Sequence, residues 1–224
     1  MKYRLFYTVT LLFGVLAVVA QTPKQWRDSL NIVNRQIMQS PDSILLYLNK
    51  ASICLQIAEW DKAVDACDFV INKEPVNLSA LYYRAFANNN LRRYTLARND
   101  YEDFLRLSPR NMEARLGLAY TLTKLDRYPD ALDHLNNLVE MYPDSSVVYA
   151  ARAGVEGEMK AFDTALYDWD EAIKRDPLNR EYVISKAEIL IRLSRFEEAE
   201  ATLNAAVRRG IPRGLLRKWF LMCY

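Results

Sequence analysis

One proline position recurs through this chain at a constant interval of 34 residues. The members of this column are Pro41, Pro75, Pro109, Pro143 and Pro177. A period of this length is typical of a solenoid, in which each repeat is one supersecondary unit and neighbouring repeats bury a continuous core. The repeat therefore limits the possible folds more than any other property of the sequence.

Three more columns follow the same period. Two of them consist of alanine alone, namely Ala51, Ala85, Ala119, Ala153 and Ala187, and then Ala63, Ala97, Ala131, Ala165 and Ala199. The third is always aromatic, with Trp26, Trp60, Tyr94, Tyr128, Phe162 and Phe196. Apolar residues within a repeat have helical spacing that breaks near each aromatic residue, which predicts a pair of helices. The alanines are expected at the seam, because only a small side chain lets two antiparallel helices approach closely.

The prolines predict where each second helix ends. The residue before a proline is pushed out of the α region, and the proline itself has no amide hydrogen to donate. Asn77, Asn111, Ser145 and Asn179 follow two residues after four of the prolines. These side chains are expected to cap the helix that begins each following repeat.

This pattern resembles the tetratricopeptide repeat family. The resemblance covers five full repeats, from Ile44 to Arg213, and departs at Ile211, which stands where the sixth proline would fall. It implies an all-α fold, a right-handed superhelical solenoid of antiparallel helix hairpins, made of five 34-residue repeats plus terminal helices. The expected repeats are 44–77, 78–111, 112–145, 146–179 and 180–213.

The two ends are expected to be single helices, since the terminal units of a solenoid are usually atypical. Residues 21–43 carry an apolar stripe in phase with a second helix, which predicts an N-terminal half-repeat. Residues 214–224 are expected to form a C-terminal capping helix that covers the fifth repeat. Its segment 215–222 is apolar almost all round, so the alternative is a docking helix through which the chain associates with another chain or with itself.

Residues 1–20 have the pattern of a secretory signal peptide. Lys2 and Arg4 precede a charge-free run from Leu5 to Val19, and small or apolar residues lead up to Ala20. Cleavage would make Gln21 the first residue and leave no membrane span. The alternative is a retained anchor, but the run is shorter than the roughly 20 residues that a spanning helix needs. We therefore expect an exported protein, either periplasmic, envelope-associated or secreted.

The composition argues against several classes of function. The sequence has 30 Lys and Arg against 28 Asp and Glu, too even a balance for electrostatic capture of nucleic acid. A single histidine and three cysteines do not support a metal site or histidine-based catalysis. No metal, cofactor or enzymatic activity is expected. Carboxylate pairs such as Asp168 with Asp170 are interpreted as solvated helix faces.

Two cysteines are candidates for either packing or a crosslink. Cys54 and Cys67 lie on the two helices of the first repeat, both at apolar positions of the helical pattern. A free cysteine commonly serves as a small buried hydrophobic residue, so core packing is expected. The alternative, open to an exported protein, is a disulfide between them.

The resemblance also implies where a partner would bind. In the tetratricopeptide repeat family the first helices line a concave groove that holds a peptide, and the matching positions here are Asn49, Ser52, Tyr83, Phe86, Asn90, Tyr120, Lys124, Glu158, Glu188 and Arg192. A clamp for a terminal carboxylate is not expected, because its places hold Leu48, Ser52, Tyr83, Glu113 and Gly117.

The expected function is a non-enzymatic scaffold that binds a protein or peptide segment in this groove. The alternative is a structural subunit of an envelope assembly that associates through its terminal helices.

Overall fold

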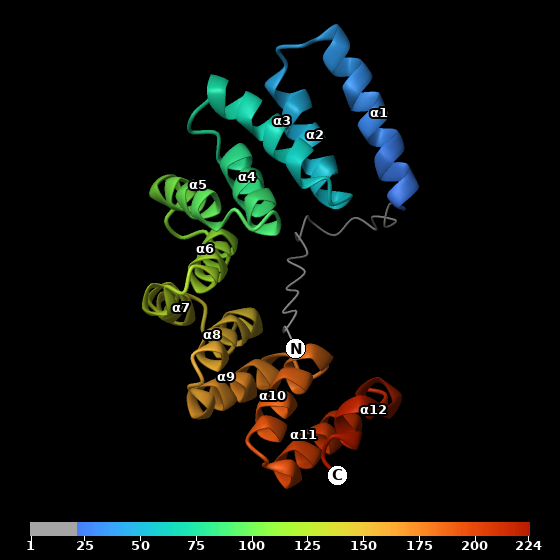
Figure 1. The fold of residues 1–224 in the computed structure, drawn as a ribbon, viewed down its shortest axis with the longest axis vertical. Helices are drawn as coiled ribbons and strands as arrows, with labels where there is room; N and C mark the ends of the chain where they lie inside the picture. Colours follow the sequence, from blue (N-terminus) through green and yellow to red (C-terminus); the bar gives the residue numbers. More distant parts are fainter. Residues whose placement is uncertain (1–21) are drawn as a thin grey trace. The chain divides into compact units, whose positions relative to one another are not determined.

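The computed structural model describes residues 22–224, and every regular element in that range is an α-helix (Figure 1). The all-α fold of antiparallel helix hairpins predicted from the sequence is confirmed. The expected signal segment, residues 1–20, lies outside the described residues. The helices are α1 (Pro23–Gln39), α2 (Ile44–Gln56), α3 (Trp60–Lys73), α4 (Leu78–Asn90), α5 (Tyr94–Leu107), α6 (Met112–Lys124), α7 (Tyr128–Met141), α8 (Ser146–Glu158), α9 (Phe162–Arg175), α10 (Arg180–Arg192), α11 (Phe196–Arg208) and α12 (Arg213–Leu221).

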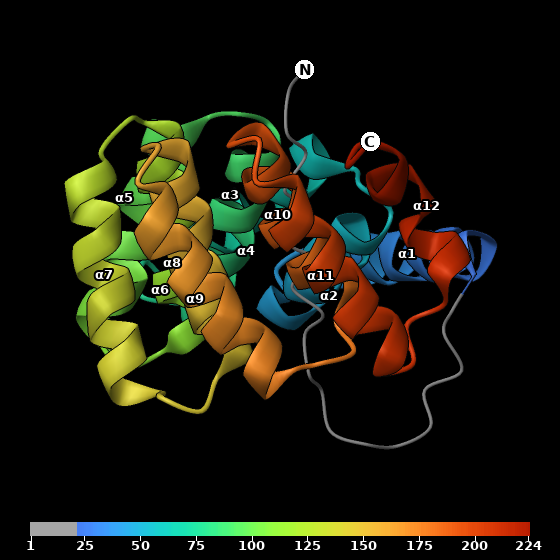
Figure 2. The ribbon, with the colours of Figure 1, turned by 90° about the horizontal axis from the view of Figure 1, so that it is seen from below.

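The chain divides into two compact units, and the division falls inside α6, between Gly117 and Leu118. In the first unit each helix from α1 to α5 packs on the next one along the chain. In the second unit the same holds from α7 to α11, and α8 and α9 lie side by side (Figure 2). Contacts between neighbours in sequence are what a stack of repeats requires. Among residues 22–224, no helix is both long enough and apolar enough to span a membrane.

The alanine columns lie at the helix seams. All ten alanines are buried, with exposed fractions from 0 to 2%. They belong to the first and second helices of the hairpins, where a side chain of one carbon leaves the two backbones close together. The larger apolar residues around them, such as Leu135, Leu190 and Leu203, fill the space beside the seam and are equally buried.

The aromatic column marks the start of each second helix. Trp60, Tyr94, Tyr128, Phe162 and Phe196 are the first residues of α3, α5, α7, α9 and α11. The break in apolar spacing near each aromatic residue therefore corresponds to the turn inside the hairpin.

That turn uses a left-handed backbone without glycine. Two residues before each aromatic residue, φ lies between 58° and 62°, at Ala58, Arg92, Asp126, Lys160 and Ser194. The next amide then donates back to the first helix, as from Glu59 to the carbonyl of Cys54 at 2.9 Å. This is the common helix-ending motif in which glycine usually holds the left-handed position. A non-glycine residue there costs about 1 kcal/mol, so tertiary packing must hold each turn in place.

Three of the four expected helix caps are confirmed. The side-chain oxygens of Asn77, Asn111 and Asn179 accept hydrogen bonds from backbone amides in the first turns of α4, α6 and α10, over 2.8 to 3.2 Å. The fourth expectation is wrong. Ser145 stands at the N-cap position of α8, but its side chain makes no capping hydrogen bond.

The last helix, α12, packs against α10 and α11. Leu216 and Phe220 are buried in a cluster with residues of both helices, and the indole of Trp219 donates to Glu188 at 3.0 Å. The opposite side of α12 leaves Leu215 and Leu221 exposed by 49 and 68%. One side of α12 thus closes the core of the second unit, while apolar side chains remain on the other.

Two alanines of α11 test the seam. Ala199 belongs to a seam column and is fully buried, whereas Ala201 lies on the same helix and is exposed. We expect Ala199→Leu to lower the free energy of unfolding by about 1 to 3 kcal/mol, because extra methylene groups overpack the seam. Ala201→Leu should change it by less than about 0.5 kcal/mol. Equal urea-unfolding curves for the two variants would contradict the assigned register.

Candidate functional site

The ten residues proposed for the groove all lie on the first helices of the hairpins. In the first unit α2 carries Asn49 and Ser52, and α4 carries Tyr83, Phe86 and Asn90. In the second unit α6 carries Tyr120 and Lys124, α8 carries Glu158, and α10 carries Glu188 and Arg192. The set is therefore divided between the two units.

In the first unit the two aromatic residues also pack against the fold. Tyr83 is half-buried beside the core cluster of α2, α3 and α4. The ring of Phe86 meets Trp60 edge to face, with 6.0 Å between the centroids. Asn90 is exposed and its amide donates to the carbonyl of Phe86 at 2.9 Å, while Asn49 is exposed on α2. The side-chain amides of Asn49 and Asn90 are therefore the exposed polar groups among the proposed groove residues of this unit.

In the second unit four of the positions interact with neighbouring side chains. The ammonium group of Lys124 lies 5.4 Å from the ring centroid of Tyr120, and that tyrosine is 38% exposed. Arg192 lies 5.1 Å from the ring centroid of Phe162. Glu188 accepts the hydrogen bond from Trp219, so this carboxylate already has a hydrogen-bond partner on α12.

Gly117 occupies a place where a side chain cannot fit. A Cβ atom built there would lie 2.5 Å from Cζ of Tyr101, whose ring is buried in the first unit. The close approach of ring and backbone explains why glycine stands in the middle of α6. This position of the third repeat thus packs against a neighbour and offers no side chain for binding.

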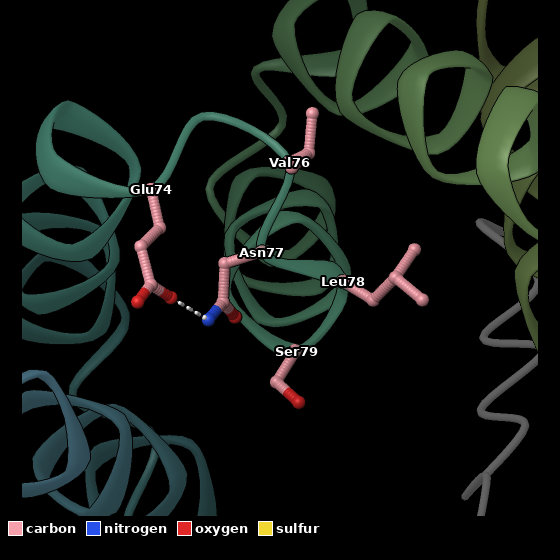
Figure 3. Close-up of a pocket in the computed structure, with 5 residues that line it drawn as sticks. All are labelled: Glu74, Val76, Asn77, Leu78 and Ser79. Atoms are coloured by element: carbon pink, nitrogen blue, oxygen red, sulfur yellow. Dashed lines mark hydrogen bonds between the residues drawn. The ribbon is translucent and has the colours of Figure 1, made fainter.

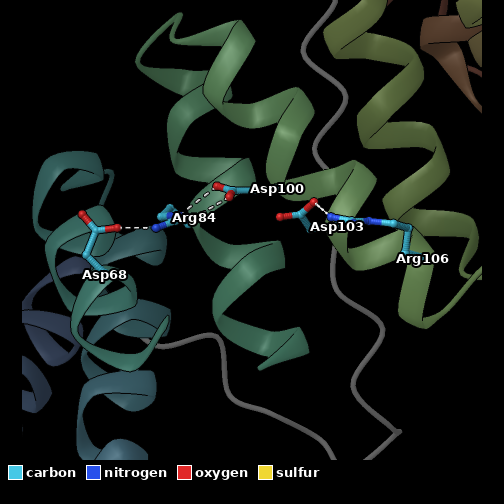
Figure 4. Close-up of polar contacts among 5 residues, drawn as sticks. All are labelled: Asp68, Arg84, Asp100, Asp103 and Arg106. Atoms are coloured by element: carbon cyan, nitrogen blue, oxygen red, sulfur yellow. Dashed lines mark hydrogen bonds and ion pairs between the residues drawn. The ribbon is translucent and has the colours of Figure 1, made fainter. Parts of the chain in front are cut away.

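A partly buried polar cluster that was not predicted from the sequence joins three helices of the first unit. Arg84 on α4 donates to both carboxylate oxygens of Asp100 on α5, over 2.9 and 2.6 Å (Figure 4). It also donates to Asp68 on α3 at 2.6 Å. On the surface of the same α5, Asp103 pairs with Arg106. We call Arg84, Asp68 and Asp100 the first clasp.

The second unit repeats this arrangement 68 residues later, which is two repeats. Arg152 on α8 donates to both oxygens of Asp168 on α9, over 2.6 and 2.8 Å. It also donates to Asn136 on α7 at 2.9 Å. We call Arg152, Asn136 and Asp168 the second clasp.

The second clasp corrects one expectation. Asp168 was expected on a solvated helix face, but it is 1% exposed and held by Arg152. Its neighbour Asp170 is exposed and pairs with Lys186 at 2.6 Å. The signal that could have found the clasps is the 68-residue spacing of Arg84 with Arg152 and of Asp100 with Asp168.

Electrostatics keep both arginines charged. Burial lowers the pKa of the Arg84 guanidinium, but its hydrogen bonds to Asp100 and Asp68 raise the pKa on balance. The hydrogen bonds to Asp168 are the main cause that raises the pKa of Arg152. In each clasp the arginine forms an ion pair with an aspartate of its own hairpin and donates a hydrogen bond to a side chain of the preceding hairpin. Removing the arginine would leave the aspartate without its partner in the interior.

A single substitution tests the second clasp. We expect Arg152→Met to lower the free energy of unfolding by about 3 kcal/mol, because it leaves the Asp168 carboxylate buried without its partner. Arg180→Met removes an exposed arginine of the same unit and should cost less than about 0.5 kcal/mol. Urea unfolding followed by circular dichroism measures both. Similar losses in the two variants would contradict a structural role for the clasp.

The cysteines are free thiols, so the alternative of a disulfide between Cys54 and Cys67 is not what the structure contains. Both are fully buried. Burial raises the pKa of Cys54 to about 11 and that of Cys67 to about 12, which keeps them protonated and unreactive at neutral pH. The sole histidine, His134, is half-buried on α7. Within residues 22–224, no three ligating side chains gather as they would for a metal ion.

A shallow hollow lies at the turn between α3 and α4. Its lining is Glu74, Val76, Asn77, Leu78 and Ser79, all from one short stretch of chain (Figure 3). The amide of Asn77 donates to Glu74 at 2.7 Å, and its oxygen caps α4. The hydrogen bonds of Asn77 thus stabilise the turn and the start of α4. None of the proposed groove residues lines the hollow.

Comparison with known proteins gives the family. The family model described as "Tetratricopeptide repeat" matches residues 87–146 and 159–213, just over half of the chain. The chain belongs to the tetratricopeptide repeat family.

Curated relatives match over part of their length. The chain is 26% identical over 91 residues to Hsp70-Hsp90 organizing protein 3 of Arabidopsis thaliana, covering 41% of this chain and 16% of that protein. It is 29% identical over 97 residues to stress-induced-phosphoprotein 1 of Caenorhabditis elegans, covering 43% of this chain and 30% of that protein. The chain thus spans less than a third of the length of either relative.

Solved structures share the fold. A tetratricopeptide repeat protein from Parabacteroides merdae has a TM-score of 0.70 at 19% identity, covering 89% of this chain and 78% of that one. YrrB, described as a tetratricopeptide repeat protein with an unusual peptide-binding site, has a TM-score of 0.59 at 19% identity, covering 79% of this chain and 91% of that one. At this identity the likeness concerns the fold.

Proposed function

We propose that the protein is a non-enzymatic scaffold that binds a protein or peptide segment through the outward residues of its first helices. The observation that carries this proposal is the register of the repeat. The alanines and the large apolar residues face the seams, and the candidate positions retain exposed amide, aromatic and charged side chains such as Asn49, Tyr120 and Lys124. Membership of a family of protein-interaction repeats supports the same conclusion.

The chemistry of these positions favours a ligand with apolar side chains and free backbone groups. Half-buried aromatic rings at Tyr83 and Phe86 and the exposed ring of Tyr120 provide apolar contact area, and Asn49 and Asn90 provide amides for backbone hydrogen bonds. The name of the relative from Arabidopsis thaliana refers to Hsp70 and Hsp90. The places of a carboxylate clamp hold Glu113 and Gly117 here, which favours another class of ligand.

A displayed library of short random peptides tests this proposal on the full chain. We expect the wild type to select a peptide family with apolar anchors. Replacing Tyr83, Phe86 and Tyr120 with Ala should weaken binding of the selected peptide at least about tenfold, because aromatic anchors commonly dominate interface energy. Fluorescence anisotropy of the labelled peptide measures the loss, and helical circular dichroism monitors the fold.

The matched control replaces exposed apolar residues of the second helices. Leu96 on α5 and Tyr167 on α9 are exposed by 53 and 63%, so Leu96→Ala with Tyr167→Ala removes similar apolar area elsewhere. This variant should bind the peptide as the wild type does. Equal weakening in both variants, or selection of no peptide, would count against the proposal.

An end-to-end structural role is the second candidate. It is favoured by the exposed Leu215, Leu221 and Met222 of the α12 segment. Sedimentation of the wild type would then show concentration-dependent mass, and replacing these three residues with Ser would abolish it without affecting Leu216 and Phe220 in the core.

We also propose that the protein is exported. This proposal is supported by the charged start, the apolar run and the small residues of segment 1–20. A periplasmic, envelope-associated or secreted location would place the binding surface outside the cytoplasm.

A further inference from the structure

The two clasps differ at two matched positions: Asp68 in the first corresponds to Asn136 in the second, and the place beside the arginine differs as well. Glu156 on α8 lies 68 residues after Asn88 on α4, so the two side chains occupy the same place in their repeats. Asn88 is 2% exposed, and Glu156 is half-buried. The second clasp therefore has its second carboxyl group at the place where the first clasp has a neutral amide.

The surroundings of Glu156 do not favour its ionised form. Its Oε2 atom is buried and has no hydrogen-bond partner among the described residues. Arg152 donates hydrogen bonds to Asp168 and Asn136, and none of these goes to Glu156. A buried carboxylate oxygen without a hydrogen-bond donor is costly when the group is ionised, so the protonated form of Glu156 is favoured.

We infer that the second clasp is a proton-dependent latch: a proton from solvent, bound by Glu156 beside Asp168, keeps α7, α8 and α9 packed together, and its loss loosens them. The bound form has one arginine and one ionised aspartate, which balance. The form without the proton has two carboxylates, of which Arg152 bonds only Asp168, whereas Arg84 of the first clasp bonds both of its carboxylates. The first clasp has no carboxyl group at the place of Glu156, because Asn88 stands there and cannot titrate.

The charged groups around Glu156 give the direction of the effect. Burial is the main cause that raises the pKa of Glu156 to about 7, and the charge of Asp168 on α9 adds to it. The Thr164 hydroxyl on α9 and the charge of Arg152 on α8 oppose the rise, and α7 contributes the neutral Asn136 to the clasp.

The pH dependence of the folded protein's stability follows from the raised pKa of Glu156. In the unfolded chain a glutamate titrates near its ordinary value of 4.5. A group with a raised pKa in the folded state gives its full stabilisation below that ordinary value and loses it as the pH rises through about 7. The latch is therefore closed in mildly acidic solution and opens on the alkaline side of neutrality.

Hydrogen exchange of the full chain at pH 5.5 and pH 8 tests the latch. After correction for intrinsic exchange, we expect the protection of amides in α8 and α9 to fall by about tenfold at the higher pH. The reason is that the loss of one proton changes the opening equilibrium by up to about tenfold per pH unit. Glu156→Gln keeps the size of the side chain and removes its titration. In that variant the fall should disappear.

Glu140→Gln is the matched control, because Glu140 is an exposed carboxylate on α7 of the same unit. This variant should keep the tenfold fall. The inference is overturned if the wild type shows no fall between the two pH values, or if Glu156→Gln shows the same fall as the wild type. Both variants are near-isosteric amides, so their circular dichroism at pH 5.5 should match that of the wild type.

Discussion

The close approach of paired helices at the alanine seam is the constraint on which the rest of the structure depends. Each hairpin joins two helices whose contact positions are single-carbon side chains with almost no exposure. This approach fixes the rotation of both helices about their axes. It thereby decides which residues reach the core, which reach the neighbouring hairpin, and which point outward from the first helix. A larger side chain in one alanine column would disturb all three sets together.

The features that recur with one residue type in every repeat could be predicted from the sequence. Proline, alanine and aromatic columns specify the turns, the seams and the starts of the second helices, and the structure has them at those places. The left-handed turns could not be predicted, because Ala58, Arg92 and Asp126 share a backbone conformation and no side-chain property. The clasps were missed because arginine and aspartate recur in every second repeat, and a single charged residue on a helix normally indicates a solvated face.

Of the candidate site, the sequence predicted the helices but not the environment of each residue. All ten positions lie on first helices, yet Glu188 is engaged by Trp219 and Phe86 packs on Trp60. Such contacts join residues far apart in the chain, so a periodic pattern does not contain them. The structure thus separates two roles. Seams hold the two helices of a hairpin together and clasps add contacts to the preceding hairpin. The remaining outward positions take no part in seams or clasps and vary between repeats, as the proposed recognition surface requires.

The central claim is that these first-helix positions form the binding surface. The most direct measurement is a titration of the isotope-labelled protein with a selected peptide, followed through its backbone amide resonances. The account predicts that the largest shifts cluster on α2, α4, α6, α8 and α10, around residues such as Asn49, Asn90 and Tyr120. Shifts concentrated on the second helices or on the exposed side of α12 would contradict it.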